Sequence, residues 1–226
     1  MADEAPSART RLRRSPTRGR YDRTAIDAIL DAGLLCHVGY VIDGQPMVTP
    51  TLYWREGDRV YWHGSAASNM LRAVDGSPVC LTVSHFDGLV LARSGFHHSV
   101  NYRSVMLLGD ARVEDASESP ELLDRFVDAM VPGRAAAVRP ATEQELKATT
   151  VVSIAIDEVS AKVREGGPVD DDEDYELPIW AGVVPLHLEV DAAIPDERLA
   201  AGIELPDHVE AVKDARWAQP ASIPPA

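Results

Sequence analysis

The sequence has no long apolar run and very little cysteine, and each lack excludes a class of protein. No stretch of the 226 residues approaches the roughly 20 apolar residues that cross a bilayer. No apolar segment follows the basic N-terminus, as a secretory signal would require. The two cysteines, Cys36 and Cys80, lie inside apolar strand-like runs, which favours buried free thiols over a disulfide or a catalytic thiol. We therefore expect a cytoplasmic protein without a membrane partner.

Basic residues are outnumbered by acidic ones, 22 Lys and Arg against 36 Asp and Glu, which gives a net charge of −14. Binding to a phosphate backbone needs a basic surface, so nucleic acid is not expected as the main partner. The exception is local, and the basic residues of the first 23 positions are Arg9, Arg11, Arg13, Arg14, Arg18, Arg20 and Arg23. This segment favours a flexible arm or one that docks on an acidic partner subunit, with nonspecific nucleic-acid contact as a weaker alternative.

Sequence motifs of metal, hydrolase and nucleotide chemistry are missing as well. There is no HExxH or CxxC spacing, no G-x-S-x-G and no Walker sequence. The neighbours His97 and His98 would point to opposite faces of a strand and so could not easily share one metal ion. The acidic run 170–174 lacks the spacing and the glycine of an EF-hand, which favours a solvated loop over a cation site. No metal site is expected.

The patterns that are present predict many strands and few helices. Apolar runs bounded by turn residues predict strands over 34–42, 47–55, 59–63, 79–86, 89–94, 102–113, 151–156, 159–164 and 180–190. Apolar spacing and end signals predict helices over 24–32, 66–74, 119–130 and 142–147. Asp43-Gly44 and Asp87-Gly88 are typical of hairpin turns. The expected fold is mainly β, an antiparallel β-barrel with a few helices.

The most informative stretch runs from Asp87 to Asp110. Apolar segments on each side enclose a group of polar and aromatic residues, R-S-G-F-H-H-S-V-N-Y-R-S. Donors and rings held between buried strands are costly unless something binds there. Cations and rings together would suit a planar, phosphorylated ligand.

This stretch and V-Y-W-H-G-S-A-A-S-N-M-L-R at 60–72 resemble the pyridoxamine 5'-phosphate oxidase-related flavin-binding proteins. The similarity runs from about Tyr21 to Leu188 and is greatest to the branch that contains nitroimidazole-resistance proteins. It implies a split β-barrel of the FMN-binding type, in a homodimer whose flavins lie between the two protomers. The expected organisation is an Arg-rich arm over 1–20, the barrel over 21–190, and an extension over 191–226 that wraps the surface.

The resemblance also implies where the flavin binds. The strand-to-helix junction 63–70 would hold the phosphate, as backbone N–H groups at a helix start commonly do, although a plain capped helix is the alternative. In the family a cationic residue usually follows the second serine, where this chain has Asn69 and Met70. Arg103 is therefore expected to help bind the phosphate. The alternative is that Arg103 forms a structural ion pair. Trp180 would lie near the flavin, or else be a core tryptophan. The expected cofactor contacts are Val48, Thr49, Pro50, Thr51, Trp62, His63, Gly64, Ser65, Ser68, Asn69, Met70, Arg103, Ser104 and Trp180.

The function that this resemblance implies is an FMN-dependent oxidoreductase with an unidentified small-molecule substrate. Arg134 and Arg139 are candidates to bind an anionic substrate, and no side chain is assigned a catalytic role. Pyridoxamine phosphate itself is disfavoured, because A-G-V-V-P-L-H-L lacks the arginine that the oxidases carry there. The alternatives are a flavin-binding or flavin-sequestering protein without turnover, and a member that binds haem or a deazaflavin. A haem would be ligated by His37, His63 or His98.

Overall fold

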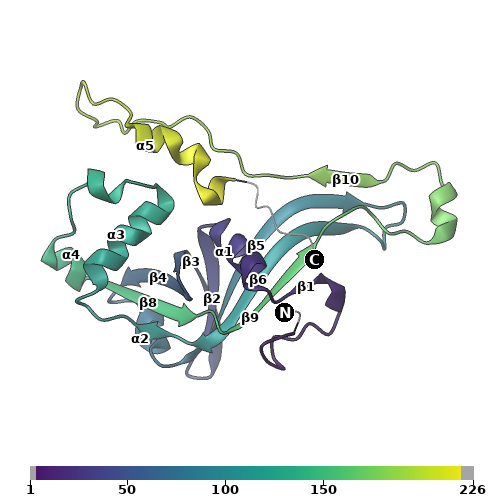
Figure 1. The fold of residues 1–226 in the computed structure, drawn as a ribbon, viewed down its shortest axis with the longest axis horizontal. Coiled ribbons are helices and arrows are strands. Elements are labelled where there is room, and N and C mark those ends of the chain that lie inside the picture. The colour runs from purple at the N-terminus through teal and green to yellow at the C-terminus, as the bar shows by residue number, and fades with distance from the viewer. Residues whose placement is uncertain (1–3, 220–226) are drawn as a thin grey trace.

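One antiparallel sheet curls around the core and forms most of the molecule (Figure 1). The computed structural model describes residues 4–219, and its strand order is β1-β9-β6-β5-β2-β3-β4-β8-β7, with β10 added to β5. The strands are β1 (Gly19–Arg20), β2 (Leu35–Ile42), β3 (Gln45–Glu56), β4 (Arg59–Ser65), β5 (Pro78–Leu91), β6 (Ser99–Asp110), β7 (Arg112–Val113), β8 (Thr149–Ala155), β9 (Glu158–Arg164) and β10 (Gly182–Pro185). The helices are α1 (Arg23–Asp31), α2 (Asn69–Val74), α3 (Ser119–Met130), α4 (Glu143–Lys147) and α5 (Asp207–Glu210).

The barrel interior follows from strict alternation along the strands. In β2 the side chains of Cys36, Val38 and Tyr40 face inward and are buried, and Leu81 and Val83 of β5 continue the same layer. Helix α1 closes one end with an apolar face of Ala25, Ile26, Ile29 and Leu30. This arrangement confirms the predicted mainly β barrel with few helices. Burial raises the pKa of the Cys36 thiol to about 12, and both cysteines are free.

The two Asp-Gly pairs behave differently. Asp43 and Gly44 have φ angles of 51° and 79°, and they form the predicted tight turn between β2 and β3. The hairpin turn predicted at Asp87-Gly88 is wrong, because β5 continues through it with a shift in register between Phe86 and Gly88. This is a β-bulge. A Cβ on Gly88 would lie 2.9 Å from the carbonyl oxygen of Val184, so the glycine permits β10 to approach.

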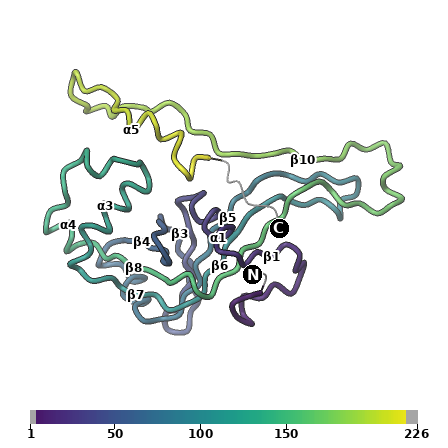
Figure 2. The backbone as a smooth tube through the Cα atoms, viewed as in Figure 1, coloured from purple at the N-terminus to yellow at the C-terminus, as the bar shows by residue number. Residues whose placement is uncertain are grey.

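Beyond the bulge, the ends of β5 and β6 project from the barrel together with β10. We call this three-stranded unit, residues 88–91, 99–101 and 182–185, the tongue. Figure 2 shows it extending to one side, with β10 running alongside. The closing strand predicted over 180–190 is therefore shorter than expected and pairs with β5 only over 182–185.

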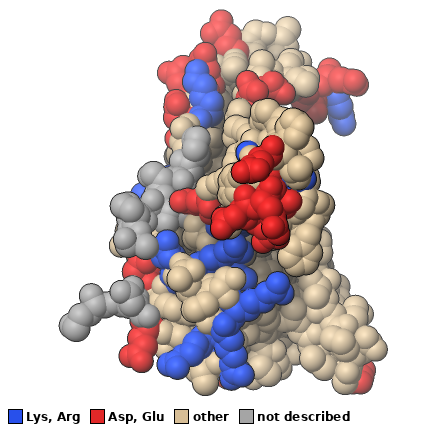
Figure 3. Space-filling model, turned by 90° about the vertical axis from the view of Figure 1, so that its right-hand side faces the viewer, with Lys and Arg blue, Asp and Glu red and all other residues tan. Residues whose placement is uncertain are grey.

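The acidic run is attached to the tip of the tongue. Asp170 is buried and accepts hydrogen bonds from the backbone N–H and Nη1 of Arg93, at 3.0 and 3.1 Å. His97 Nε2 lies 3.3 Å from Asp171 Oδ2. Figure 3 shows acidic side chains gathered at this end of the molecule, with Lys and Arg side chains grouped below them. Within residues 4–219, no group of three or more His, Cys, Asp or Glu side chains is placed to hold a metal ion.

The N-terminal arm, where the structure describes it, contacts the barrel of its own chain. Strand β1 pairs with β9, Thr10 is buried, and Arg9 forms an ion pair with Glu158. The hydroxyl of Tyr21 accepts a hydrogen bond of 2.9 Å from the backbone N–H of Leu12. These contacts attach the arm to its own barrel, and the flexibility predicted for residues 1–20 stays a prediction. No helix among the described residues is both long and apolar enough to cross a bilayer.

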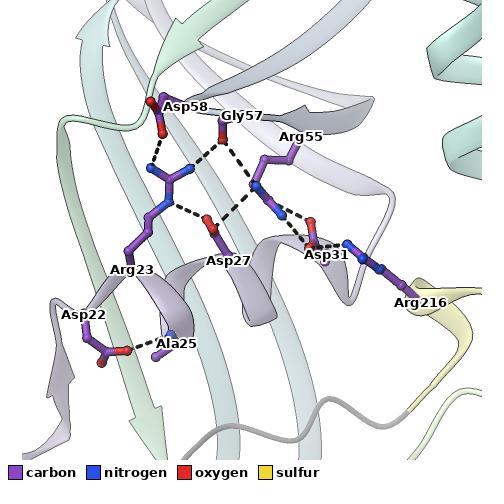
Figure 4. A network of polar contacts seen from close by, with 9 residues as sticks. All are labelled: Asp22, Arg23, Ala25, Asp27, Asp31, Arg55, Gly57, Asp58 and Arg216. Atoms are coloured by element: carbon purple, nitrogen blue, oxygen red, sulfur yellow. Dashed lines mark hydrogen bonds and ion pairs between the residues drawn. The ribbon is translucent and has the colours of Figure 1, made fainter.

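The C-terminal segment returns to the barrel and is anchored by ion pairs (Figure 4). Arg216 donates to Asp31 Oδ2 at 3.1 Å, beside Arg55, which binds both oxygens of the same carboxylate at 2.8 and 2.6 Å. The next residue, Trp217, donates its indole N–H to the carbonyl oxygen of Met130 at 2.9 Å. These contacts place the end of the described chain against α1 and α3.

Candidate functional site

A cavity of about 830 Å³ opens where the barrel, the tongue and the C-terminal segment meet. Its volume lies within the range of roughly 300–1,000 Å³ typical of small-molecule sites. Its lining comes from the start of β2, the middle of β5 and β6, β10 and the segment after it, and the C-terminal segment. The lining residues are 32–35, 84–87, Asn101, Arg103, Glu165, Val183, 185–188 and 217–219.

Arg103 is the cation that reaches this cavity from β6. Its Nε lies 2.9 Å from Asp87 Oδ2 and its Nη2 lies 2.7 Å from Asp87 Oδ1. The ion pair considered as an alternative is therefore present. The remaining nitrogen, Nη1, is buried and has no hydrogen-bond partner among the described residues. A buried donor without a partner costs about 1–3 kcal/mol, so Nη1 is available to an acceptor on a bound molecule.

The Arg103–Asp87 pair also defines what kind of acceptor fits. The carboxylate of Asp87 compensates the guanidinium charge, which leaves little net charge for a phosphate. Its two oxygens hold the guanidinium plane in one orientation, because a bidentate pair restricts both partners. The geometry thus favours a neutral acceptor such as a ring carbonyl. Phosphate binding by Arg103 stays a prediction.

His85 of β5 is the direct partner of Arg103 in the sheet register and lines the same cavity. Its Nε2 lies 2.9 Å from the carbonyl oxygen of Ile29, so this nitrogen carries a proton and donates. Burial lowers the pKa of the imidazole, which keeps it neutral near pH 7. Gly33 makes room for the ring, because a Cβ there would lie 2.6 Å from His85 Cε1.

The predicted phosphate junction lies outside this cavity. None of residues 62–70 is among the cavity-lining residues. Ser65 ends β4 and its Oγ accepts from the backbone N–H of Ala67 at 3.2 Å, while Ser68 precedes α2 without a side-chain cap bond. Asn69 accepts a hydrogen bond of 2.6 Å from Arg72. The structure therefore does not bring the junction and Arg103 together within one chain's cavity.

Two other predicted contacts point into the barrel. Trp62 is fully buried and Met70 is also part of the core, because both occupy inward positions of β4 and α2. Neither residue lines the cavity, and their predicted contact with the cofactor stays a prediction. His63, between them in sequence, packs against Phe126 with ring centroids 4.3 Å apart, and burial lowers its pKa. Its Nδ1 is buried without a partner among the described residues. Gly64 lies beside Leu71, whose Cδ1 would be 3.1 Å from an added Cβ.

The remaining predicted site residues lie elsewhere on the surface. In β3, Val48 and Pro50 face outward and are exposed, Thr49 shares a hydrogen bond of 3.0 Å with Tyr40, and Thr51 is half-buried. Ser104 is half-buried, with its Oγ 3.4 Å from the carbonyl oxygen of Lys162.

Three predicted site residues lie outside the barrel strands: Trp180, Arg134 and Arg139. Trp180 is exposed, which excludes the alternative of a core tryptophan. Arg134 lies 3.3 Å from His208, and Arg139 pairs with Glu145. Neither arginine lines the cavity, and substrate binding by them stays a prediction.

Two cavity residues, His85 and Trp217, are not among the site residues predicted from the sequence. A signal existed for each. His85 is a polar residue that follows the inward-facing Val83 by two positions, and Trp217 is an isolated large aromatic in a Pro- and Ala-rich tail. Neither signal indicates that the two residues line the same cavity.

Comparison with known proteins gives a family and two highly similar structures. A family model described as pyridoxamine 5'-phosphate oxidase matches residues 22–163. The flavocytochrome Anf3 from Azotobacter vinelandii is 48% identical over 92% of this chain and 97% of its own, with a TM-score of 0.89. The FAD- and heme-binding protein from Mycobacterium smegmatis is 39% identical over 86% of this chain and 97% of its own, with a TM-score of 0.84.

A more distant likeness supports the fold alone. A putative 5-nitroimidazole antibiotic resistance protein from Bacteroides thetaiotaomicron is 23% identical over 64% of this chain and 86% of its own, with a TM-score of 0.53. No curated protein matches the chain. The two similar structures therefore carry more weight than the nitroimidazole-resistance branch that the sequence motifs suggested.

Proposed function

The chain belongs to the pyridoxamine 5'-phosphate oxidase family, and because two highly similar structures are a flavocytochrome and an FAD- and heme-binding protein, we propose that it is a redox protein that binds FAD together with haem. This differs from the expectation of FMN as sole cofactor and follows the alternative that included haem. A flavin exchanges one or two electrons and a haem iron exchanges one, so the pair can connect a two-electron donor to a one-electron acceptor.

The observation that carries the proposal is the extent of the similarity to the Azotobacter flavocytochrome. An alignment over 92% of the chain omits about 18 residues, whereas 63 residues follow Val163, where the family model ends. At least about 45 of these 63 residues must therefore lie within the aligned region. The part of the chain after Val163 supplies Glu165, Val183, 185–188 and 217–219 to the cavity beside the barrel.

The residues of this cavity fit a flavin. The unpartnered Arg103 Nη1 offers a donor to a ring carbonyl, and the Asp87 pair holds that donor in place. Phe86, Leu186 and Trp217 provide apolar surface for a ring system. His85 is held neutral and adds no charge to the site. We therefore assign the flavin ring to this cavity.

A homodimer is part of the proposal. The outward face of the β2–β3 hairpin carries Leu35, Val41, Val48 and Leu52, all exposed and all on one side according to the strand register. A contiguous apolar face of this kind is uncommon on a monomer and typical of an interaction site. A second copy of the chain would cover it and bring residues 48–51 of one protomer toward the other's cavity. Multi-angle light scattering of the purified protein tests this, and a monomer at micromolar concentration would contradict it.

The cofactor proposal is tested by identifying what the protein binds. The purified full-length chain is incubated with FAD, FMN and haemin in turn, and the affinity of each is measured by titration. We expect micromolar or tighter binding of FAD and haem, with a Soret band and a flavin band in one sample. Thermal stabilisation should accompany each binding event. Binding of FMN in preference to FAD, with no Soret band, would instead support the FMN-dependent oxidoreductase.

A further inference from the structure

We infer that His98 is the axial ligand of the haem, which would lie against one apolar face of the tongue. The inference rests on the proposed function and adds to it the haem-binding residue of this chain. It is carried by two observations, the composition of that face and the hydrogen bond of the His98 ring.

The apolar face follows from the register of the three tongue strands. Val184 pairs with Leu89, and Leu89 pairs with Val100, so their side chains form one row on the same side of the sheet. They are 39%, 39% and 37% exposed. These three neighbouring apolar side chains, each more than a third exposed, form an apolar surface that the described residues leave open to solvent.

The next row of the same face contains His98. Gly182 pairs with Leu91, and His98 directly precedes Ser99, the residue of β6 that pairs with Val90, so the register continued by one residue would set His98 opposite Leu91. The ring of Trp180 lies over Gly182 on this side, because a Cβ on the glycine would lie 3.0 Å from the indole. The tongue therefore presents an imidazole next to an indole and aliphatic side chains. An apolar plane with one imidazole ligand suits a haem that is bound through histidine.

The His98 ring is fixed in the state that binds iron. Its Nδ1 lies 2.8 Å from the carbonyl oxygen of Ser94, and a carbonyl oxygen only accepts, so Nδ1 carries the proton. The lone pair is then on Nε2, for which no partner is present among the described residues, and the side chain is exposed. Metal-ligating histidines commonly donate their second N–H to a carbonyl or carboxylate, which orients the ring.

Three of the other histidines, His63, His85 and His97, are less suited. His85 uses Nε2 for the Ile29 carbonyl and is left with Nδ1, the nitrogen beside its own main chain. Nε2 of His97 faces Asp171 at 3.3 Å. His63 packs against Phe126 beneath α3. Each of these rings is occupied or enclosed in a way that His98 is not.

His37 is the strongest competitor. It is exposed in the middle of the apolar β2–β3 face, opposite Pro50 and Thr82. No hydrogen bond to its ring is present among the described residues, so neither nitrogen is fixed as the free one. It therefore serves as the comparison variant, a second histidine on an apolar sheet face, here the face that the proposed homodimer would cover, without an orienting carbonyl.

The test reconstitutes full-length wild type, His98→Ala, His37→Ala and His97→Ala with haemin in the presence of FAD. Visible and electron paramagnetic resonance spectra report the iron ligand, and FAD content is measured in the same samples. We expect His98→Ala to lose at least tenfold in haem affinity or to change its Soret position and spin state. Added imidazole should restore the wild-type spectrum, because it replaces the missing ligand. FAD content and the melting temperature without cofactors should stay near wild type.

Two results would overturn the assignment, and they differ. Wild type that binds no haem refutes the haem part of the proposed function, and the assignment with it. Wild type that binds haem while His98→Ala keeps the same affinity and spectrum refutes the assignment alone. Loss of the wild-type spectrum in His37→Ala, with His98→Ala unaffected, would place the ligand on β2. Should His98→Ala fold poorly, His98→Gln provides the same comparison with a polar side chain in the loop.

Discussion

Replacing Arg103 with methionine separates what this residue does for the fold from what it does for a ligand. Methionine keeps the length of the aliphatic stem but removes both hydrogen bonds to Asp87 and the free Nη1. Removing one partner of a charge-assisted pair costs about 1.5–3 kcal/mol. The Arg103 side chain is 12% exposed and Asp87 is 30% exposed, so solvent relieves part of this. We expect the free energy of unfolding without cofactor to fall by about 2 kcal/mol.

The effect on FAD affinity depends on the atom that Nη1 meets. A hydrogen bond to a neutral ring carbonyl contributes about 1 kcal/mol, which corresponds to about a fivefold loss of affinity. A bond to a phosphate contributes about 2–3 kcal/mol, or roughly a 30- to 150-fold loss. The structure favours the smaller figure, because Asp87 already compensates the charge of the guanidinium. The size of the loss thus identifies the acceptor.

The assay combines urea unfolding of the cofactor-free protein with FAD titration by fluorescence quenching. Arg139→Met is the matched control, since Arg139 also binds a carboxylate through two nitrogens but is exposed and outside the cavity. It should cost less than about 1 kcal/mol and leave FAD affinity unchanged. If Arg103→Met is destabilised but binds FAD with wild-type affinity per folded molecule, Nη1 does not contact the flavin and the cavity assignment fails.

Three further outcomes test the fold around the site. Arg55→Met removes both hydrogen bonds to Asp31 and should lower the free energy of unfolding by about 2 kcal/mol in urea, and a change below 0.5 kcal/mol would contradict the role of this pair. Phe126→Ala should lower the free energy of unfolding by about 3 kcal/mol, because it leaves a cavity beside Trp54 and His63. FAD affinity should not change. A loss of FAD binding free energy of the same size would show that α3 contributes to the site. Burial lowers the pKa of His85 and His63 below the ordinary 6.5, so the unfolded chain binds more protons there and stability should fall as the pH drops below about 6.5. His85→Gln should flatten that dependence in urea titrations between pH 5 and 8, and an unchanged slope would exclude His85 as its source.

Local patterns in the sequence specify which way most side chains face. Alternation in 34–42 predicts the inward positions of Cys36 and Val38, and the Asp43-Gly44 turn follows from the need for positive φ. The serine, proline and apolar spacing of 119–130 predict α3 at its observed bounds. The motifs at 60–72 and 87–110, which resemble the family, predict the split barrel. These features depend on residues within a few positions of one another, which is why a linear pattern contains them.

Partners across the sheet depend on register and bulges, which no local pattern contains. Asp87-Gly88 has the composition of a turn, yet it is a bulge because β6 continues opposite it and β10 packs on the glycine. Beside that bulge Asp87 pairs with Arg103, 16 residues away, an ion pair that no local pattern predicts. The cavity itself joins Leu34, His85, Leu186 and Trp217 from four distant segments. The face of the sheet on which a side chain lies depends on its own strand. The residues beside it depend on the pairing of strands that are distant in the sequence. The candidate site consists of residues brought together by such pairing.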